Sequence, residues 1–172
     1  TIKPSKTHFG RKQVDNLGHV VDNTGISVPR EYTQVVEEWP LPTNVKEIRV
    51  FLGKMSYYRK FIKDYSALAA PLSNYVTEEA LVKRDKIQLT EEAIRTFHIL
   101  KRKLLSAPIL AYPDFNSKHP FIVDCDFAAD PGAIGGVLSQ VQNGQERVIA
   151  YGARKLLPRE RNYGSNKGEL TA

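Results

Sequence analysis

The hydrophobic pattern of the chain changes once, after Pro113-Asp114, and this change limits the folds that the sequence can adopt. Before it, apolar residues recur every three or four positions, as they do on one face of a helix. After it come three apolar stretches, residues 121–127, 133–141 and 147–153, separated by turn sequences that contain Pro-Gly and Asn-Gly pairs. Helices grouped before strands, rather than alternating with them, predict an α+β fold.

The chain is predicted to begin with a β-hairpin and a small helical bundle. Residues 13–28 are typical of a hairpin with its turn at Asn23-Thr24-Gly25, and Pro29 opens a short helix. The strongest helix signal runs from Asn44 to Lys63. Asn44 is placed to cap this helix, with Glu47 reaching back in a capping box. Its buried stripe is predicted to contain Ile48, Phe51, Leu52, Met55, Tyr58 and Ile62.

Two further helices complete the predicted bundle. The first covers residues 64–76 and is interrupted near Pro71. The second covers 91–106, where Thr90 caps the start and Pro108 follows the end. The polar stretch between the two is predicted to be a loop.

Positive charge is concentrated in the helical part of the chain. Residues 1–119 hold 19 Lys and Arg against 13 Asp and Glu, whereas residues 120–172 hold six of each. The helix that begins at Asn44 has a polar face with small residues between basic ones: Arg49, Gly53, Ser56, Lys60 and Lys63. Such a face suits a polyanion that approaches closely. The alternative is that Gly53 lets another helix pack there.

The first strand of the second part carries two carboxylates among apolar neighbours. Asp124 and Asp126 are two positions apart, so both side chains point to one face of the strand. Buried carboxylates are costly unless hydrogen-bonded, paired or bound to a cation. The sequence favours either a cation site or carboxylates at a strand end that accept hydrogen bonds from turn amides. The single cysteine, Cys125, excludes an internal disulfide and a multi-cysteine zinc site.

Several segments together resemble one protein family. KTHFGRKQVDNLGHVVDNTGI, WPLPTNVKEIRVFLGKMSYYRKFIKDYSALAAPL and LKRKLLSAPILAYPDF resemble the end of the palm and the thumb of Ty3/gypsy-type retrotransposon reverse transcriptases. FIVDCDFAADPGAIGGVLSQ and GQERVIAYGARKLLPRERNYGSNKGELTA resemble the start of the ribonuclease H domain. The resemblance implies a palm end over 1–42, a thumb bundle over 43–112, a linker over 113–119 and a partial ribonuclease H-like unit over 120–172. That last unit should hold three antiparallel strands and the start of a helix.

The resemblance implies that the helical part grips nucleic acid. Leu17, Gly18 and His19 match the hairpin that holds the primer end, and the helix with Arg49 and Gly53 matches the thumb helix along the duplex. The expected partners are RNA–DNA hybrid, duplex DNA template–primer and the rest of the polymerase. No apolar run is long enough to suggest a membrane partner. The resemblance implies that the protein is intracellular, in a cytoplasmic particle or in the nucleus.

The resemblance also implies a two-metal nuclease site. Asp126 matches the first-strand aspartate and Glu169 the helix glutamate, which would bind Mg²⁺ or Mn²⁺; Asp124 is the less favoured ligand. Ala128 departs from the usual serine, and two further carboxylates have no counterpart here. We therefore expect the chain alone to be inactive, whereas its parent synthesises DNA and cleaves RNA in hybrids.

Two other functions remain open from the sequence. One is a non-catalytic, connection-like or host-retained module that binds nucleic acid, which the substitution at Ala128 favours. The other is an unrelated basic domain that binds acidic proteins.

Overall fold

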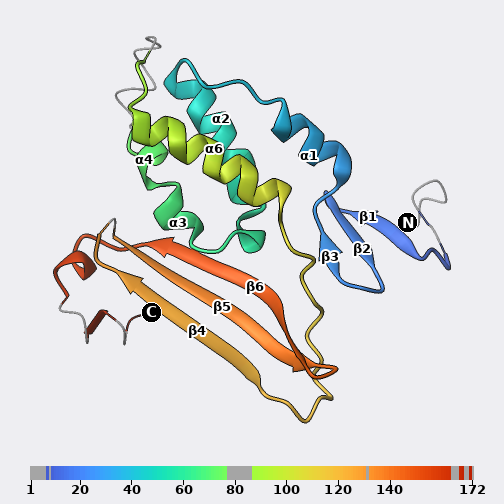
Figure 1. The fold of residues 1–172 in the computed structure, drawn as a ribbon. Helices are drawn as coiled ribbons and strands as arrows, with labels where there is room; N and C mark the ends of the chain where they lie inside the picture. Colours follow the sequence, from blue (N-terminus) through green and yellow to red (C-terminus); the bar gives the residue numbers. More distant parts are fainter. Residues whose placement is uncertain are drawn as a thin grey trace.

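The computed structural model describes residues 7, 9–76, 87–130, 132–163, 167–168 and 171. Helices and a small sheet form one part, and a larger three-stranded sheet lies beneath the helices (Figure 1). This is the α+β arrangement that the sequence predicts. The predicted domain boundaries stay a prediction. In the described part of the chain, no helix has the length and apolarity to cross a bilayer.

The N-terminal sheet differs from the predicted hairpin. It has three antiparallel strands, β1 (Gln13–Asn16), β2 (His19–Asp22) and β3 (Ile26–Ser27). The predicted turn at residues 23–25 joins β2 to β3, and the Asp22 carboxylate accepts hydrogen bonds from its amides. The unpredicted turn is Leu17-Gly18, with φ of 47° and 71°. Positive φ at both central positions is typical of a type I′ hairpin turn, but leucine rarely adopts it.

The helical part contains five α-helices and one 3₁₀ helix in the described residues: α1 (Arg30–Glu37), α2 (Val45–Tyr57), η2 (Arg59–Phe61), α3 (Tyr65–Leu68), α4 (Ala70–Ser73) and α6 (Glu91–Leu105). The predicted interruption near Pro71 is confirmed, because Pro71 lies in the first turn of α4. Thr90 caps α6 through a hydrogen bond from the Ala93 amide, as predicted. Residues 77–86, most of the predicted loop, lie outside the described residues.

The predicted cap of α2 is confirmed, but the helix is shorter than predicted. The Glu47 amide donates to the Asn44 side chain at 2.9 Å, and the Glu47 carboxylate accepts from the Thr43 amide at 2.7 Å. The helix ends at Tyr57 instead of Lys63. Its end coincides with hydrogen bonds from Tyr57 and Tyr58 to the Leu17-Gly18 turn.

The core lies where α2, α4 and α6 pack together. Phe51 and Phe97 are fully buried, with ring centroids 4.5 Å apart. Leu72 of α4 and Leu100 of α6 are also inaccessible to solvent. The periodicity of α2 and α6 therefore predicts the centre of the core correctly. In α1, Val36 is buried whereas its neighbour Val35 is 57% exposed.

The second sheet is an antiparallel meander of β4 (Phe121–Ala128), β5 (Ala133–Gln142) and β6 (Gln145–Lys155). It confirms the three predicted strands and the Asn143-Gly144 turn, where φ is positive at both residues. Tyr151 and Ala153 of β6 pack against the helical core, so the helices and the sheet share buried apolar surface. A 3₁₀ helix, η3 (Glu160–Asn162), follows.

The strand β4 is more exposed than its sequence suggests. The stretch from Phe121 reads as a buried strand, yet Val123 is 64% exposed and Cys125 is exposed. The reason is position: in the described residues β4 is an edge strand, and the helices cover β6 and part of β5.

Candidate nucleic-acid interface and carboxylate site

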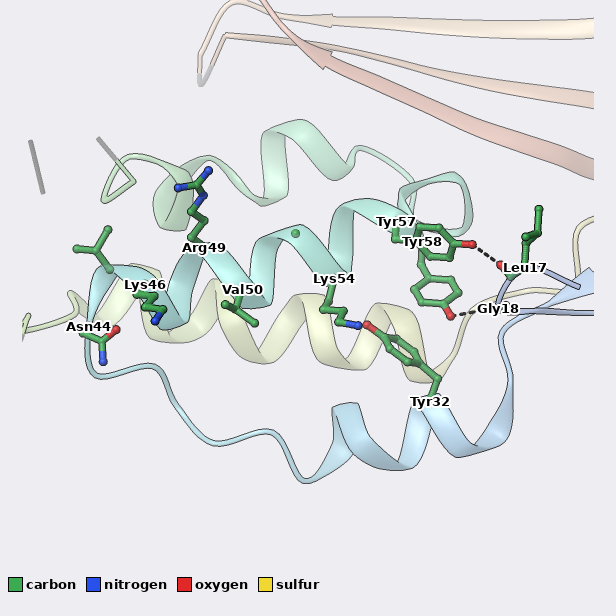
Figure 2. Close-up of a pocket in the computed structure, with 12 residues that line it drawn as sticks. Leu17, Gly18, Tyr32, Asn44, Lys46, Arg49, Val50, Lys54, Tyr57 and Tyr58 are labelled. Atoms are coloured by element: carbon green, nitrogen blue, oxygen red, sulfur yellow. Dashed lines mark hydrogen bonds between the residues drawn. The ribbon is translucent and has the colours of Figure 1, made fainter. Parts of the chain in front are cut away.

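A groove of about 1130 Å³ runs along α2 and ends at the Leu17-Gly18 turn. Lys46, Arg49 and Lys54 of α2 line it, and among the described residues no acidic side chain does (Figure 2). The acid of the first turn, Glu47, is engaged in the helix cap instead. The Thr43 amide and hydroxyl lower the pKa of the Glu47 carboxyl by donating hydrogen bonds to its charged form. The groove therefore has a positive wall.

The set of basic residues that line the groove differs from the predicted set. Arg49 and Gly53 lie in the groove as predicted, but Lys46, Val50, Lys54 and Tyr57 join them. A spacing of three or four from Lys46 through Tyr57 could have indicated this face. Lys63 lies beyond the end of α2 and is exposed. Lys60 lies in η2, half-buried, with its Nζ 5.3 Å from the Phe61 ring centroid.

Gly53 faces open space. A Cβ built on it would have no heavy atom of its surroundings within 4 Å in the described structure. The close helix approach that the sequence left open is therefore absent from the described residues. The glycine instead leaves the middle of the α2 groove free of side chain.

A second groove, of about 480 Å³, lies on the other side of Arg49 and Gly53. It contains Ser56, predicted as a binding residue, and Lys155 from the end of β6. Burial, and next the charge of Arg161, lower the pKa of Lys155. The sequence did not single out Lys155, because only the packing of the sheet under the helices brings it beside α2.

The Leu17-Gly18 turn is attached to the end of α2. The Tyr57 hydroxyl donates to the Leu17 carbonyl, and the Tyr58 hydroxyl donates to the Gly18 carbonyl at 2.8 Å (Figure 2). Tyr58, predicted to belong to the buried stripe, is buried, whereas Tyr57 is 52% exposed. Turn and helix thus form one end of the groove.

His19 lies within this aromatic cluster. Its ring centroid is 5.3 Å from that of Tyr57 and 5.7 Å from that of Phe61. The Nδ1 atom lies 3.0 Å from the Leu17 carbonyl oxygen, while the buried Nε2 has no hydrogen-bond partner among the described residues. Burial, followed by the charge of Lys60, lowers the pKa of His19, so the neutral ring is favoured.

Asp124 and Asp126 lie on the same face of β4, as predicted. Asp124 is opposite Val137 and Asp126 opposite Gly135, in register with the residues of β6 that face the helices. Both carboxylates are nevertheless exposed, because β4 is the strand farthest from β6. Among the described residues neither accepts a hydrogen bond from a turn amide, and no group of three or more acidic, His or Cys residues could hold a metal ion.

Glu169, the other predicted ligand, lies outside the described residues, as does most of the helix predicted to contain it. Residues 167 and 168 are helical, and the Gly168 backbone contacts the Phe127 ring so closely that a Cβ would clash.

An ion pair joins the end of β6 to η3: Arg154 makes two hydrogen bonds to the buried Glu160, at 2.7 and 3.2 Å. The Arg154 guanidinium, with the Leu157 amide, lowers the pKa of Glu160.

Solved structures share this fold over most of the chain. The foamy viral protease-reverse transcriptase dRH in complex with ds DNA gives a TM-score of 0.72 at 22% identity, covering 94% of this chain and 27% of that chain. The foamy viral protease-reverse transcriptase in complex with RNA/DNA hybrid gives 0.71 at 21% identity, covering 94% and 21%. The fold is that of a segment of a reverse transcriptase.

The family assignment follows from the sequence. Residues 89–172 match the RNase H-like domain found in reverse transcriptase, and this part of the chain belongs to that family. It is 40% identical to the retrovirus-related Pol polyprotein from transposon opus and 35% identical to that from transposon gypsy, both of Drosophila melanogaster. Each match covers 99% of this chain but only 17% and 16% of the respective polyprotein. The predicted Ty3/gypsy-type resemblance is confirmed.

Proposed function

We propose that this chain is the part of a retroelement reverse transcriptase that grips the template–primer duplex, and that residues 120–172 supply part of its ribonuclease H site. The observation that carries the grip is the α2 groove, which has basic walls and ends at the Leu17-Gly18 turn. In this proposal the turn, with His19, holds the primer end.

The chemistry of the α2 groove suits a duplex backbone. Lys46, Arg49 and Lys54 extend from one helix, and the part of the chain that the structure describes places no acidic residue in the groove lining. Side chains of this kind bind phosphates and position a duplex without reading its sequence. The open surface at Gly53 allows a helix to lie against the wide, shallow minor groove of an A-form-like hybrid. The similar foamy viral proteins were solved in complex with ds DNA and with RNA/DNA hybrid.

The salt dependence of hybrid binding tests the proposed grip. We compare a groove variant, Lys46→Gln/Arg49→Gln/Lys54→Gln, with a control of equal charge, Arg95→Gln/Arg102→Gln/Lys103→Gln, whose sites are exposed on α6 outside both grooves. Loss of three phosphate contacts should make the negative slope of log K against log salt shallower by about 2.7. Between roughly 50 and 200 mM salt, the affinity of the groove variant should therefore fall about 40-fold less than that of the unmodified chain.

The control variant decides between a groove and a diffuse charge effect. Its salt slope should differ from that of the unmodified chain by less than about 0.9, the value for one phosphate contact. Equal losses in the two variants would contradict a specific groove. Competition by polyglutamate as strong as that by duplex would favour the acidic-protein function instead.

The second part of the proposal concerns the nuclease. Asp126 and Glu169 would be ligands of Mg²⁺ or Mn²⁺, with Asp124 less favoured and further carboxylates supplied by the rest of the parent domain. Asp126 suits this role because it is an exposed oxygen donor on an edge strand without a competing hydrogen bond in the described residues. When bound, two such ions activate water and stabilise the leaving oxygen. The described residues do not complete a metal site, so this chain alone is expected to be inactive.

A parent enzyme that contains the complete ribonuclease H domain tests the nuclease proposal. Asp126→Asn should abolish Mg²⁺-dependent cleavage of the RNA strand while DNA synthesis continues. Asp124→Asn, on the same strand face, should reduce cleavage far less. Unchanged cleavage in the Asp126 variant would remove this residue from the site.

One observation favours a non-catalytic, connection-like unit as a second candidate. The sheet face that carries Asp126 is turned toward the helices, since a Cβ on its cross-strand partner Gly135 would lie 2.5 Å from Asp64 Oδ1. Asp126 and Asp64 line the same small cavity, of about 20 Å³. A sheet packed in this way serves as a spacer between the helices and a separate nuclease. Normal cleavage by Asp126→Asn with impaired hybrid binding by the groove variant would support it.

A further inference from the structure

The Leu17-Gly18 turn has a backbone conformation that Leu17 does not favour. Leu17 has a φ of 47° and is 82% exposed, so its side chain gains no core contacts there. An L-amino acid in the left-handed region persists where the surroundings hold it. The turn is only two residues long, because Asn16 and His19 on either side are paired.

Two hydroxyl groups from α2 hold this backbone. Tyr57 is the last residue of the helix and Tyr58 follows it, and each donates to one of the two turn carbonyls. The rings of both tyrosines also contact His19, with centroids 5.3 and 5.5 Å away. Figure 2 shows both hydroxyls pointing from the end of α2 to the turn.

The hydrogen bonds also change what the turn offers to a ligand. Carbonyl oxygens carry partial negative charge and repel phosphates. Here both carbonyls of the turn are engaged by tyrosine hydroxyls, which leaves the exposed Leu17 side chain and the small Gly18 at the end of the basic groove. A sugar or base can contact such a surface.

We infer that Tyr57 and Tyr58 are positioning residues that fix the Leu17-Gly18 turn against α2, so that turn and helix bind one nucleic-acid strand as a single surface. This inference rests on the proposed duplex grip. It assigns the tyrosine hydroxyls a role through the turn, separate from the phosphate contacts of the basic residues.

The same sheet offers a matched control. The Tyr112 hydroxyl donates to the carbonyls of Asp22 and Gly25, at 2.8 and 3.0 Å, and so holds the turn between β2 and β3. Tyr112 does not line the α2 groove. Tyr112→Phe therefore removes comparable hydrogen bonds from the same sheet outside the proposed interface.

The first measurement compares hybrid binding by Tyr57→Phe/Tyr58→Phe and by Tyr112→Phe, using fluorescence anisotropy. The phenylalanine rings keep the packing, so both variants should fold. Two lost hydrogen bonds should weaken binding by about 5- to 30-fold in the double variant. The salt slope should stay that of the unmodified chain, because no phosphate contact is removed. Tyr112→Phe should bind normally.

The second measurement reports position directly. A photo-crosslinker on Leu17→Cys, in a Cys125→Ser background, should react with one or two nucleotides near the strand end. With the double phenylalanine substitution, the crosslinks should spread over more nucleotides.

The possible results separate the two proposals. If the groove variant shows the expected shallower salt slope, but Tyr57→Phe/Tyr58→Phe has the same affinity and the same crosslinks as Tyr112→Phe, only the positioning role is refuted. If the groove variant leaves the salt slope unchanged, the duplex grip fails and the positioning role fails with it.

Discussion

Asn44→Ala is expected to destabilise the start of α2 by about 1 kcal/mol, the usual effect of removing a side-chain cap. The structure explains the magnitude: the Glu47 amide loses its acceptor at 2.9 Å, and the Glu47 carboxylate loses the Asn44 side-chain donor at 2.8 Å. The bonds from Thr43 to the carboxylate remain, so the loss should stay close to that of a single cap.

Thermal unfolding monitored by circular dichroism measures this loss as a decrease in the melting temperature. For a chain of this size, about 1 kcal/mol corresponds to about 2–4 °C in melting temperature. Asn44→Asp should retain most of the stability, since aspartate caps as well as asparagine. The control is Asn162→Ala, at an exposed site whose side chain makes no hydrogen bond to any residue that the structure describes, and its effect should stay within about 0.5 kcal/mol.

The pH dependence gives an independent test of the same cap. The folded-state pKa of Glu47 is lowered from 4.5, so its contribution is present above pH 4.5 and is lost as the pH falls through the folded pKa. Glu47→Gln should remove this part of the acid sensitivity. The cap would not contribute to stability if Asn44→Ala left the free energy of unfolding unchanged. The same would follow if Glu47→Gln left the loss of stability at acid pH unchanged.

Three further perturbations follow from the structure. Phe97→Ala should lower the free energy of unfolding by about 3–5 kcal/mol in denaturant titration, whereas Phe115→Ala, 81% exposed, should change it by less than about 0.5 kcal/mol. Lys155→Gln should reduce the salt slope of hybrid binding by about 0.9, and an unchanged slope would exclude a phosphate contact there. The lowered pKa of His19 means that its contribution to stability is full above pH 6.5 and decreases as the pH falls; melting curves of His19→Asn should show a weaker decrease below pH 6.5.

The features that the sequence predicts well depend on neighbouring residues. The caps at Asn44 and Thr90, the interruption at Pro71 and the Asn143-Gly144 turn each follow from a few adjacent side chains. The strands β4 to β6 are predicted because their apolar stretches are bounded by turn sequences. Local chemistry is sufficient for such elements.

The features that the sequence missed depend on contacts between distant residues. A leucine in a left-handed turn contradicts its local preference, and Tyr57 and Tyr58, some forty positions away, hold it in place. The helix α2 ends at Tyr57, where these contacts are made, so Lys60 and Lys63 lie beyond the helix that carries the basic groove. The exposure of β4 follows from which strands the helices cover, and periodicity alone does not carry that information.

The shared core between helices and sheet has a consequence for how the molecule would work on a duplex. Tyr151 and Ala153 pack into the helical core, so sliding the sheet past the helices would expose apolar surface. The path from the Leu17-Gly18 turn to Asp126 then has a constant length. If the proposed duplex grip is correct, the number of nucleotides between a strand end held at the Leu17-Gly18 turn and the point reached by Asp126 would therefore be fixed.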